Sequence, residues 1–211
     1  MRVTEHGARL VRMAALSLGF DPSTVRQEVK FGDRGTAIFR ALENRDVELL
    51  TEFLSSLSNE TRSFWNLESY DHVAAAELCD AIGRYDKLRF VAQEVTAPFR
   101  LLASFEFSFG IPQGDIERFR SYGIRLSETT DCRFGPCVRD ALQGSGLAHA
   151  LMPCAVDIAR RCGKERIILW GGVDAGNRRA IRFYEKHGFK ALGRFWISDR
   201  VEVLDMILYL R

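Results

Sequence analysis

A glycine-rich segment in the second half of the chain has residue types that suit an anion-binding turn. It stands between a strand-like run and an amphipathic helix, and its residues are Leu142, Gln143, Gly144, Ser145, Gly146, Leu147 and Ala148. A turn that opens a helix presents several backbone N–H groups together with the positive end of the helix dipole, so it can hold an anionic diphosphate. The turn also has a plainer explanation, because a tight strand-to-helix connection requires glycines for its backbone conformation alone.

A short helix further along the chain carries a tyrosine that can act as a proton donor. Asn177 and Tyr184 are seven residues apart, which is two helical turns, so both lie on one face of the helix. A tyrosine has a reference pKa of about 10 against about 8.5 for a thiol, so at neutral pH it is protonated and can donate to a thiolate. Both residues also have simpler roles, since Asn177 is a good N-cap and a lone tyrosine on an amphipathic helix is usually a core-edge residue.

In this order and spacing, the two segments resemble the acyl-CoA-binding core of the GNAT superfamily of N-acetyltransferases. The turn of that family reads Arg or Gln, two residues, Gly, one residue, then Gly or Ala, which matches Gln143, Gly146 and Ala148. The helix follows the family pattern N-x-x-A-x-x-x-Y-x-x-x-G-F, whose fixed positions are met by Asn177, Ala180, Tyr184, Gly188 and Phe189. The resemblance is specific over residues 136–190 and extends over 34–211 in the order of the elements.

The resemblance implies an acetyl-CoA-dependent N-acetyltransferase that acetylates a primary amine by direct attack in a ternary complex. Tyr184 would be the general acid for the leaving thiolate, and a backbone N–H of Cys137 or Val138 would polarise the thioester carbonyl. Pro136 is compatible with a strand that splays there, although a plain kinked strand explains it equally well. The CoA-binding residues that the resemblance implies are Cys137, Val138, Gln143, Gly144, Ser145, Gly146, Leu147, Ala148, Asn177 and Tyr184.

The sequence leaves the general base open. Many family members have a Glu eleven residues before the Arg or Gln of the turn, and Cys132 stands at that position here. Asp131, Glu128 and Glu106 are near enough in the sequence to act through water, but each is also explained as a solvated carboxylate on a strand. In several family members a chain of water molecules replaces a dedicated base.

Cysteine chemistry and metal binding are not expected. The five cysteines form no C-x-x-C pair, and the four histidines have no metal-ligand spacing. Buried free thiols in a reducing compartment are the interpretation that remains, without a metal or a covalent acyl-enzyme.

The hydrophobic patterns predict an α/β fold. The resemblance adds that the sheet is mixed and mostly antiparallel, with helices on both faces and splayed central parallel strands. Helices are expected over residues 4–20, 45–57, 72–82, 114–122, 146–161 and 178–187, with Pro153 kinking the fifth or removing one of its hydrogen bonds. Strands are expected over 36–42, 89–95, 99–109, 128–138, 166–170, 191–197 and 201–210. The alternation within 99–109 predicts one apolar and one mostly polar face. Residues 1–33 form a helical extension in this interpretation, and 34–211 form the acetyltransferase domain.

Composition limits the partners and the location. The net charge is +2, and the basic residues are scattered, so neither nucleic acid nor a membrane is expected as a partner. The apolar run from Met13 to Phe20 is too short for a membrane span and lacks a cleavage site, which favours a cytoplasmic protein.

The acceptor amine is not specified, although the family's acceptor pocket points to Phe64, Trp65, Tyr70 and Trp196 as lining residues. The sequence specifies no oligomeric state, and a dimer is compatible with it.

Two other functions use the same glycine-rich turn. The chain can be an acyl-CoA-binding sensor or partner-binding module without catalysis, for which the missing strand Glu argues and against which Tyr184 argues. A dehydrogenase-type dinucleotide site fits less well, because its fingerprint starts at Gly144 and Gly146 but has the bulky His149 in place of the third small residue.

Overall fold

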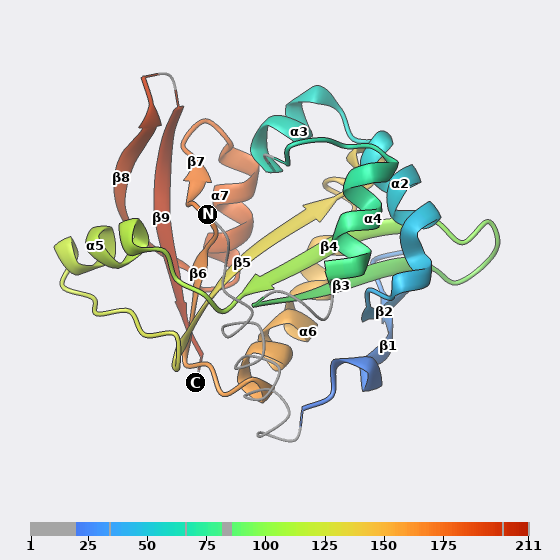
Figure 1. Ribbon diagram of the computed structural model, residues 1–211, viewed down its shortest axis with the longest axis horizontal. Helices are drawn as coiled ribbons and strands as arrows, with labels where there is room; N and C mark the ends of the chain where they lie inside the picture. Colours follow the sequence, from blue (N-terminus) through green and yellow to red (C-terminus); the bar gives the residue numbers. More distant parts are fainter. Residues whose placement is uncertain (1–19, 34, 66, 82–85, 200, 211) are drawn as a thin grey trace. The chain divides into compact units, whose positions relative to one another are not determined.

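Strands and helices alternate along the chain in a computed structural model that describes residues 20–33, 35–65, 67–81, 86–199 and 201–210 (Figure 1). The strands are β1 (Arg26–Lys30), β2 (Thr36–Ala41), β3 (Lys87–Glu94), β4 (Leu101–Ser108), β5 (Asp131–Val138), β6 (Arg166–Leu169), β7 (Val173–Asp174), β8 (Lys190–Ser198) and β9 (Val201–Tyr209). The α-helices are α2 (Val47–Ser55), α3 (Asn59–Trp65), α4 (His72–Asp80), α5 (Gln113–Ser121), α6 (Leu147–Arg161) and α7 (Arg178–Lys186). Single 3₁₀ turns are η1 (Pro22–Thr24), η2 (Asn44–Asp46) and η4 (Asp140–Leu142). The helix expected over 4–20 lies outside the described residues, and no described helix is long and apolar enough to span a membrane.

The chain forms two compact units, each of which is described by itself. The first contains the described residues up to Glu106 and the segment Pro136–Ala155, and the second contains Phe107–Gly135 and the described residues from Val156 onward. The glycine-rich turn therefore belongs to the first unit, and the tyrosine helix α7 belongs to the second.

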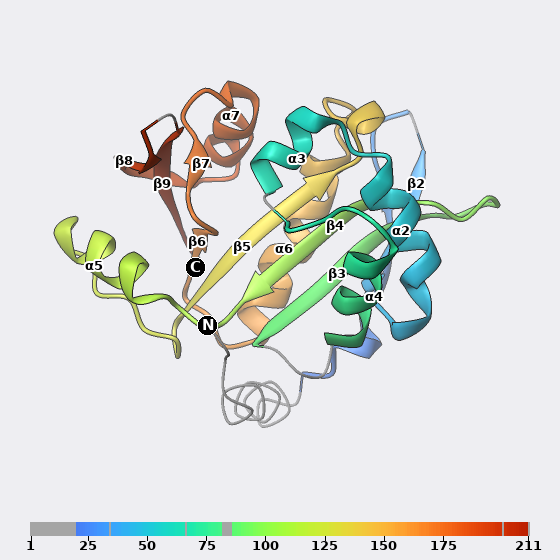
Figure 2. The same cartoon turned by 45° about the horizontal axis from the view of Figure 1, so that its top comes forward.

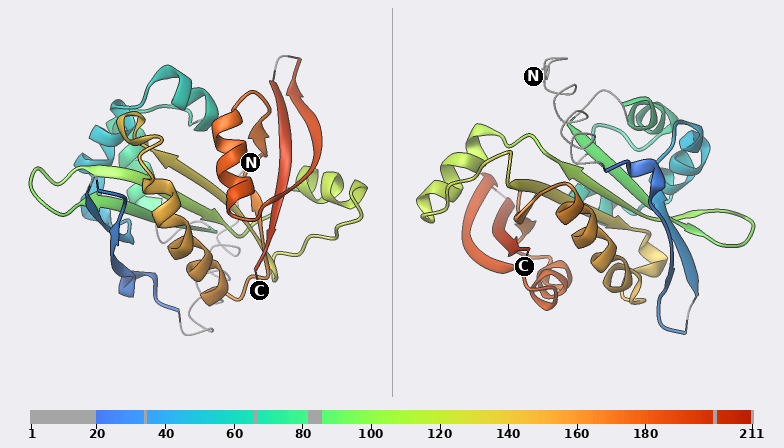
Figure 3. Two further views of the ribbon diagram at one scale, coloured as in Figure 1. Left: turned by 180° about the vertical axis from the view of Figure 1, so that it is seen from behind. Right: turned by 90° about the horizontal axis from the view of Figure 1, so that it is seen from below.

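The first unit has its strands in the order β1-β2-β3-β4. β1 pairs antiparallel with β2, and β2 pairs antiparallel with β3, with Arg40 opposite Val91. Helices α2 and α4 cover one face, where their apolar side chains form a core with Leu42, Val91 and Leu101. The opposite face carries aromatic rings, since Phe39 stacks on Phe90 at 5.6 Å between ring centroids, and the first half of α6 runs along this face (Figure 3).

The second unit has its strands in the order β5-β6-β9-β7, with β8 paired to β9. β5 and β6 are parallel and paired from Asp131 and Arg166 to Phe134 and Leu169, whereas β6, β7 and β8 each pair antiparallel with β9. β6 ends at Leu169 while β5 continues to Val138, so the parallel pair separates just before Pro136. The α/β class and the mixed, mostly antiparallel pairing are thus confirmed.

Three elements were missing from the sequence expectations: β1, β7 and α3. β1 has only Val29 buried among five residues, and α3 has only Thr61 buried among seven, so neither produces a hydrophobic period. β7 contains only two residues. Because β1 pairs with β2, the expected boundary after residue 33 falls in the turn that joins these two strands.

The face of β4 on which polar residues were expected is covered, because all eight residues of the strand are buried. Glu106 is kept in the interior by an ion pair with Arg89 of β3, at 2.8 Å. A buried carboxylate needs such a partner, and the pair explains how a polar residue occupies a covered face. Helix α6 runs unbroken through Pro153, which lacks an N–H and so removes one hydrogen bond from the helix, as expected.

Helix α5 is fixed on the β8–β9 hairpin by a buried carboxylate. Asp205 of β9 accepts hydrogen bonds from Arg118 Nε at 3.0 Å and from the Tyr122 hydroxyl at 3.1 Å. The Tyr122 ring lies so close to Gly193 of β8 that a Cβ added at Gly193 would be 2.5 Å from Cε1 of that ring. The absence of a side chain at Gly193 therefore makes room for the docked ring.

We expect Gly193→Ala to lower the free energy of unfolding by about 1–3 kcal/mol, the usual effect of overpacking. Gly114→Ala in α5 is the matched control, because its nearest added contact is at 3.9 Å and alanine favours a helix by about 0.5–1 kcal/mol. Urea unfolding of both variants should shift the midpoints in opposite directions. A Gly193→Ala protein as stable as the parent would mean that the ring moves aside without cost.

Candidate functional site

The backbone of the glycine-rich turn requires its glycines. Gly144 has φ of 78° and Gly146 has φ of 90°, both in the left-handed region that side chains disfavour. A Cβ built on either residue would have no atom of the described chain within 4 Å. The space beside both glycines is therefore not filled by the described residues, and it can admit a ligand close to the backbone.

Several N–H groups of this turn remain available for an acceptor. The N–H groups of Gln143 and Ser145 donate to carbonyls within the turn at 3.1 Å, and Leu147 N–H donates to Ser145 Oγ at 3.3 Å. Within the described part of the chain, the N–H groups of Gly144, Gly146 and Ala148 have no acceptor. These donors lie at the N-terminus of α6, where the helix dipole also favours negative charge.

The side chain of Gln143 points back into its own unit. Its Nε2 donates to Thr61 Oγ1 of α3 at 3.0 Å and to the Val138 carbonyl at the end of β5 at 3.1 Å. The side-chain amide of this expected CoA-binding residue therefore holds the turn in place. The side chain of Gln143 would therefore support ligand binding only by holding the backbone of the turn in position.

Asp140, in the 3₁₀ turn just before, binds the start of α3, the helix labelled in Figure 2. Its carboxylate accepts hydrogen bonds from Ser58 N at 2.9 Å, Ser58 Oγ at 2.6 Å and Thr61 Oγ1 at 2.7 Å. Partial burial acts to raise the pKa of Asp140, but the hydrogen bonds from Ser58 and Thr61 outweigh it and lower the pKa below its ordinary value. Asp140 is therefore an ionised anchor at neutral pH.

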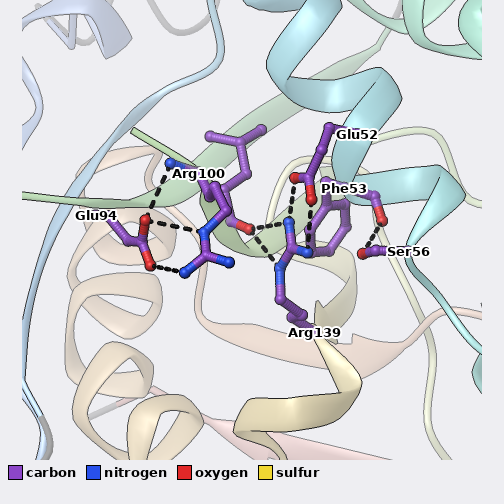
Figure 4. A network of polar contacts seen from close by, with 7 residues as sticks. Glu52, Phe53, Ser56, Glu94, Arg100 and Arg139 are labelled. Carbon is purple, nitrogen blue, oxygen red and sulfur yellow. Dashed lines mark hydrogen bonds and ion pairs between the residues drawn. The ribbon is translucent and has the colours of Figure 1, made fainter. Parts of the chain in front are cut away.

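Arg139 forms the third anchor of the turn (Figure 4). Its guanidinium donates to the Leu101 carbonyl of β4 at 3.1 Å and to Glu52 Oε1 of α2 at 2.9 Å, and it lies over the Phe53 ring. The side chains of Arg139, Asp140 and Gln143 thus attach the turn to β4, α2 and α3.

The expected carbonyl-polarising residues lie at the end of β5. Cys137 has its side chain buried in the core beneath α2 and α4, and burial raises the pKa of its thiol far above the ordinary value. Val138 uses its carbonyl as an acceptor for Gln143. The side chain of Cys137 is therefore structural, and a role in the reaction would belong to the backbone.

The second unit holds the tyrosine helix in the expected form. Asn177 caps α7, since its Oδ1 accepts from Ala180 N at 3.0 Å, and the helix runs from Arg178 to Lys186. Tyr184 is only 8% exposed and packs against Phe189 at 5.2 Å between ring centroids. The capping role of Asn177 is thereby observed, and the phenol ring of Tyr184 is held firmly by aromatic neighbours.

The three carboxylates considered as bases are engaged in structural contacts. Asp131 is fully buried and bound by Arg166 Nη2 at 2.8 Å and by Ser127 N at 2.6 Å. Glu106 is paired with Arg89, and Glu128 accepts from the N–H of Ile111 at 3.0 Å. For Asp131 and Glu106, the interpretation as solvated strand residues is wrong, because their arginine partners allow both to be buried.

The expected acceptor-lining residues are distributed over both units. Phe64 and Trp65 lie on α3 in the first unit, where Phe64 is 41% exposed and Trp65 packs edge-on against Phe53. Tyr70 follows α3, and its hydroxyl donates to the Arg62 carbonyl at 2.7 Å. Trp196 lies exposed on β8 in the second unit.

All five cysteines are free and buried. Burial raises the pKa of Cys79 to about 11 and the pKa of Cys162 to about 12, and it raises the pKa of Cys132 even further. These thiols remain protonated at neutral pH and are poor nucleophiles. Among the described residues, no group of three or more His, Cys, Asp and Glu side chains is arranged to hold a metal ion.

Sequence reasoning missed three residues of the site: Thr61, Arg139 and Asp140. Arg139 and Asp140 directly precede the turn, and a charged pair at that place is a signal that could have marked them as anchors. Thr61 lies in a polar segment 79 residues from Asp140, and nothing in its local sequence indicates the contact.

Comparison with known proteins shows the fold and a family match over part of the chain. The family model for the acetyltransferase (GNAT) family matches residues 134–189. The fold is similar to the GNAT domain of PAT from S. lividans, with 21% identity, 90% of this chain and 99% of that chain covered, and a TM-score of 0.66. It is also similar to spermidine N-acetyltransferase from Vibrio cholerae in complex with CoA and spermine, with 23% identity, 82% and 95% covered, and a TM-score of 0.60.

A third similar structure is that of yncA from Salmonella typhimurium with its cofactor acetyl-CoA, with 20% identity, 83% and 94% covered, and a TM-score of 0.59. A comparison with curated protein sequences gives no match.

We expect none of the five thiols to react with dithiobis(nitrobenzoate) within minutes at pH 8 in the folded protein, and all five to react in denaturant. For Cys79, Cys132, Cys137 and Cys162, the raised pKa means that thiolate forms only at higher pH than for an exposed cysteine, so their folded-state rate should not increase sharply between pH 7 and 9. Cys154 is protected by burial. The release of nitrothiobenzoate, followed by absorbance with free cysteine as control, measures this. A fast reaction of one equivalent would reveal an accessible thiol and reopen a covalent mechanism.

Proposed function

We propose that this chain, which matches the model of the acetyltransferase (GNAT) family over residues 134–189 and has a fold similar to a GNAT domain, transfers an acetyl group from acetyl-CoA to a primary amine. The transfer is direct, in a ternary complex of protein, acetyl-CoA and amine. Acetyl-CoA is the co-substrate, and the protein supplies its binding site, a polarising N–H and a proton donor.

The observation that carries this proposal is the turn at Gly144–Ala148. Three N–H groups of this turn, those of Gly144, Gly146 and Ala148, have no acceptor in the described chain, and open space adjoins both glycines. A diphosphate supplies the acceptors that these groups lack and is favoured by the α6 dipole. The side chains of Arg139, Asp140 and Gln143 also hold the turn to the neighbouring elements.

The chemistry needs few further groups. The amine nitrogen attacks the thioester carbonyl carbon, the carbon–sulfur bond breaks, and the sulfur takes a proton from the Tyr184 hydroxyl. A backbone N–H of Cys137 or Val138 stabilises the negative charge that develops on the carbonyl oxygen. The proton of the amine leaves through water, because Asp131, Glu106 and Glu128 are all engaged elsewhere.

Direct transfer is favoured over a covalent acyl-enzyme by the state of the cysteines. A two-step route would need an accessible thiolate, whereas all five thiols are buried and burial raises the pKa of four of them. The acceptor is a small-molecule or protein amine. Since one similar structure contains spermine, polyamines belong in the first panel of amines to be tested.

We expect Gly144→Asp to weaken CoA binding by at least 10²-fold. The substitution places a carboxylate against the diphosphate, and two like charges at 4 Å repel by about 4 kcal/mol at an effective dielectric constant of 20. Gly123→Asp is the matched control, because Gly123 also has φ of 78° and no atom within 4 Å of an added Cβ. Both variants carry the same backbone strain, so calorimetry with CoA separates strain from charge. Equal affinity of the Gly144→Asp and Gly123→Asp proteins would place the diphosphate elsewhere.

We expect Tyr184→Phe to lower turnover by about 10²-fold or more, with acetyl-CoA affinity within a few-fold of the parent. The substitution removes one hydroxyl and keeps the ring that packs on Phe189. Tyr209→Phe, which removes a half-exposed hydroxyl in the same unit, should leave turnover unchanged. Steady-state kinetics with an amine that the parent accepts, following the released thiol, makes the comparison. A Tyr184→Phe protein as fast as the parent removes this residue from the mechanism, and CoA binding without turnover of any amine favours the sensor function.

A further inference from the structure

We propose that Thr61 is a positioning residue that couples CoA binding at the glycine-rich turn to the orientation of α3. The inference rests on the proposed function, because it requires the CoA diphosphate to bind at Gly144–Ala148. It goes further in assigning a role to α3, which has no part in the proposed chemistry.

Thr61 is the point at which the turn and α3 are joined. Its hydroxyl donates to Asp140 Oδ1 at 2.7 Å and accepts from Gln143 Nε2 at 3.0 Å, so one side chain contacts Asp140 just before the turn and Gln143 within it. The residue is 7% exposed, and in such a place each of these hydrogen bonds is protected from competition with water. All the groups involved belong to the first unit.

α3 is held mainly by hydrogen bonds. Thr61 is its one buried residue among those described, so little apolar surface fixes the helix. Its other attachments include Arg62, whose Nη2 donates to the Ser55 carbonyl at 2.9 Å and whose carbonyl accepts from the Tyr70 hydroxyl at 2.7 Å. Trp65, which is partly buried, packs against the core and edge-on against Phe53. An element with few buried apolar contacts moves at low cost, so a change at Thr61 can reorient it.

The connection to the ligand is short. Gln143 directly precedes Gly144, whose N–H is one of the donors available to the diphosphate. Binding of the diphosphate restricts the backbone at Gly144 and thereby the position of the Gln143 amide, which bonds to Thr61. Trp65 lies one helical turn beyond Thr61, next to the exposed ring of Phe64. In this proposal, CoA binding therefore sets the position of the aromatic residues of α3.

Thr61→Val is a suitable test because it leaves no buried group without a partner. Asp140 keeps both hydrogen bonds from Ser58, and Gln143 keeps its bond to the Val138 carbonyl at 3.1 Å. Valine is also β-branched and similar in shape, so the fold should persist. Thr61→Ser restores the hydroxyl without the methyl group and serves as the matched control.

The experiment uses Trp65 as a reporter of α3. The chain has three tryptophans, so Trp170→Phe with Trp196→Phe leaves Trp65 as the single one. We expect the fluorescence emission of Trp65 in this single-tryptophan parent to change when CoA is added. The CoA concentration at the midpoint of this change should agree with the affinity measured by calorimetry. The Thr61→Ser protein should show the same change. The Thr61→Val protein should lose the CoA-dependent change in Trp65 emission. Its affinity for CoA should fall by less than about tenfold, which corresponds to the loss of one or two hydrogen bonds.

Three results would contradict the proposal, and they are distinguishable. If CoA binds by calorimetry but the Trp65 emission of the parent does not change, α3 is not coupled to the turn, and the proposed function stands. If the Thr61→Val protein shows the full change, the coupling exists but does not pass through Thr61. If CoA does not bind to the parent at all, the proposed function fails together with the inference.

Discussion

The glycine-rich turn must keep its shape and yet leave the N–H groups of Gly144, Gly146 and Ala148 without an acceptor in the described chain, and neighbouring elements of the first unit help to meet this requirement. A turn usually becomes rigid by hydrogen-bonding its own backbone, which would consume the donors that an anion needs. Here side chains provide the rigidity: Arg139 binds β4 and α2, Asp140 binds α3, and Gln143 binds α3 and β5. Apart from the residues next to each glycine in the chain, no described atom comes within 4 Å of a Cβ added at Gly144 or Gly146, so the space beside these glycines stays open.

The same principle explains why acidic residues near the site are unsuitable as bases. Glu106 and Asp131 lie on central strands, where a carboxylate is buried and needs a cation, and Arg89 and Arg166 supply one to each. A buried carboxylate that is already bound by an arginine is not presented to a substrate amine. In the proposed reaction, proton removal from the amine is therefore left to solvent, in keeping with Cys132 at the position where many GNAT members have a glutamate.

The sequence predicted the parts of this protein whose signals are local. The glycines of the turn, the cap at Asn177 and the apolar periods of α2, α6 and β9 all reflect backbone conformation or burial within a short window, and the structure has each of them. The missed elements lack such a signal, since α3 and β1 bury one residue each. The contacts of Thr61 could not be predicted from the sequence for another reason. Its partners are 79 and 82 residues away along the chain, and only folding brings them together.

The polar character that hid β1 from sequence analysis has its own effect on how the protein behaves in solution. β1 is the terminal strand of its sheet, and its exposed side chains are Arg26, Gln27, Glu28 and Lys30. An edge strand offers unpaired N–H and C=O groups to any other strand, and charged side chains along it discourage such pairing. Arg26, Glu28 and Lys30 carry charges that lose hydration when another strand pairs with β1. β1 is therefore a poor template for intermolecular sheet growth. The strand thus protects the chain against aggregation at high concentration, a property that depends on the same residues that give it no hydrophobic period.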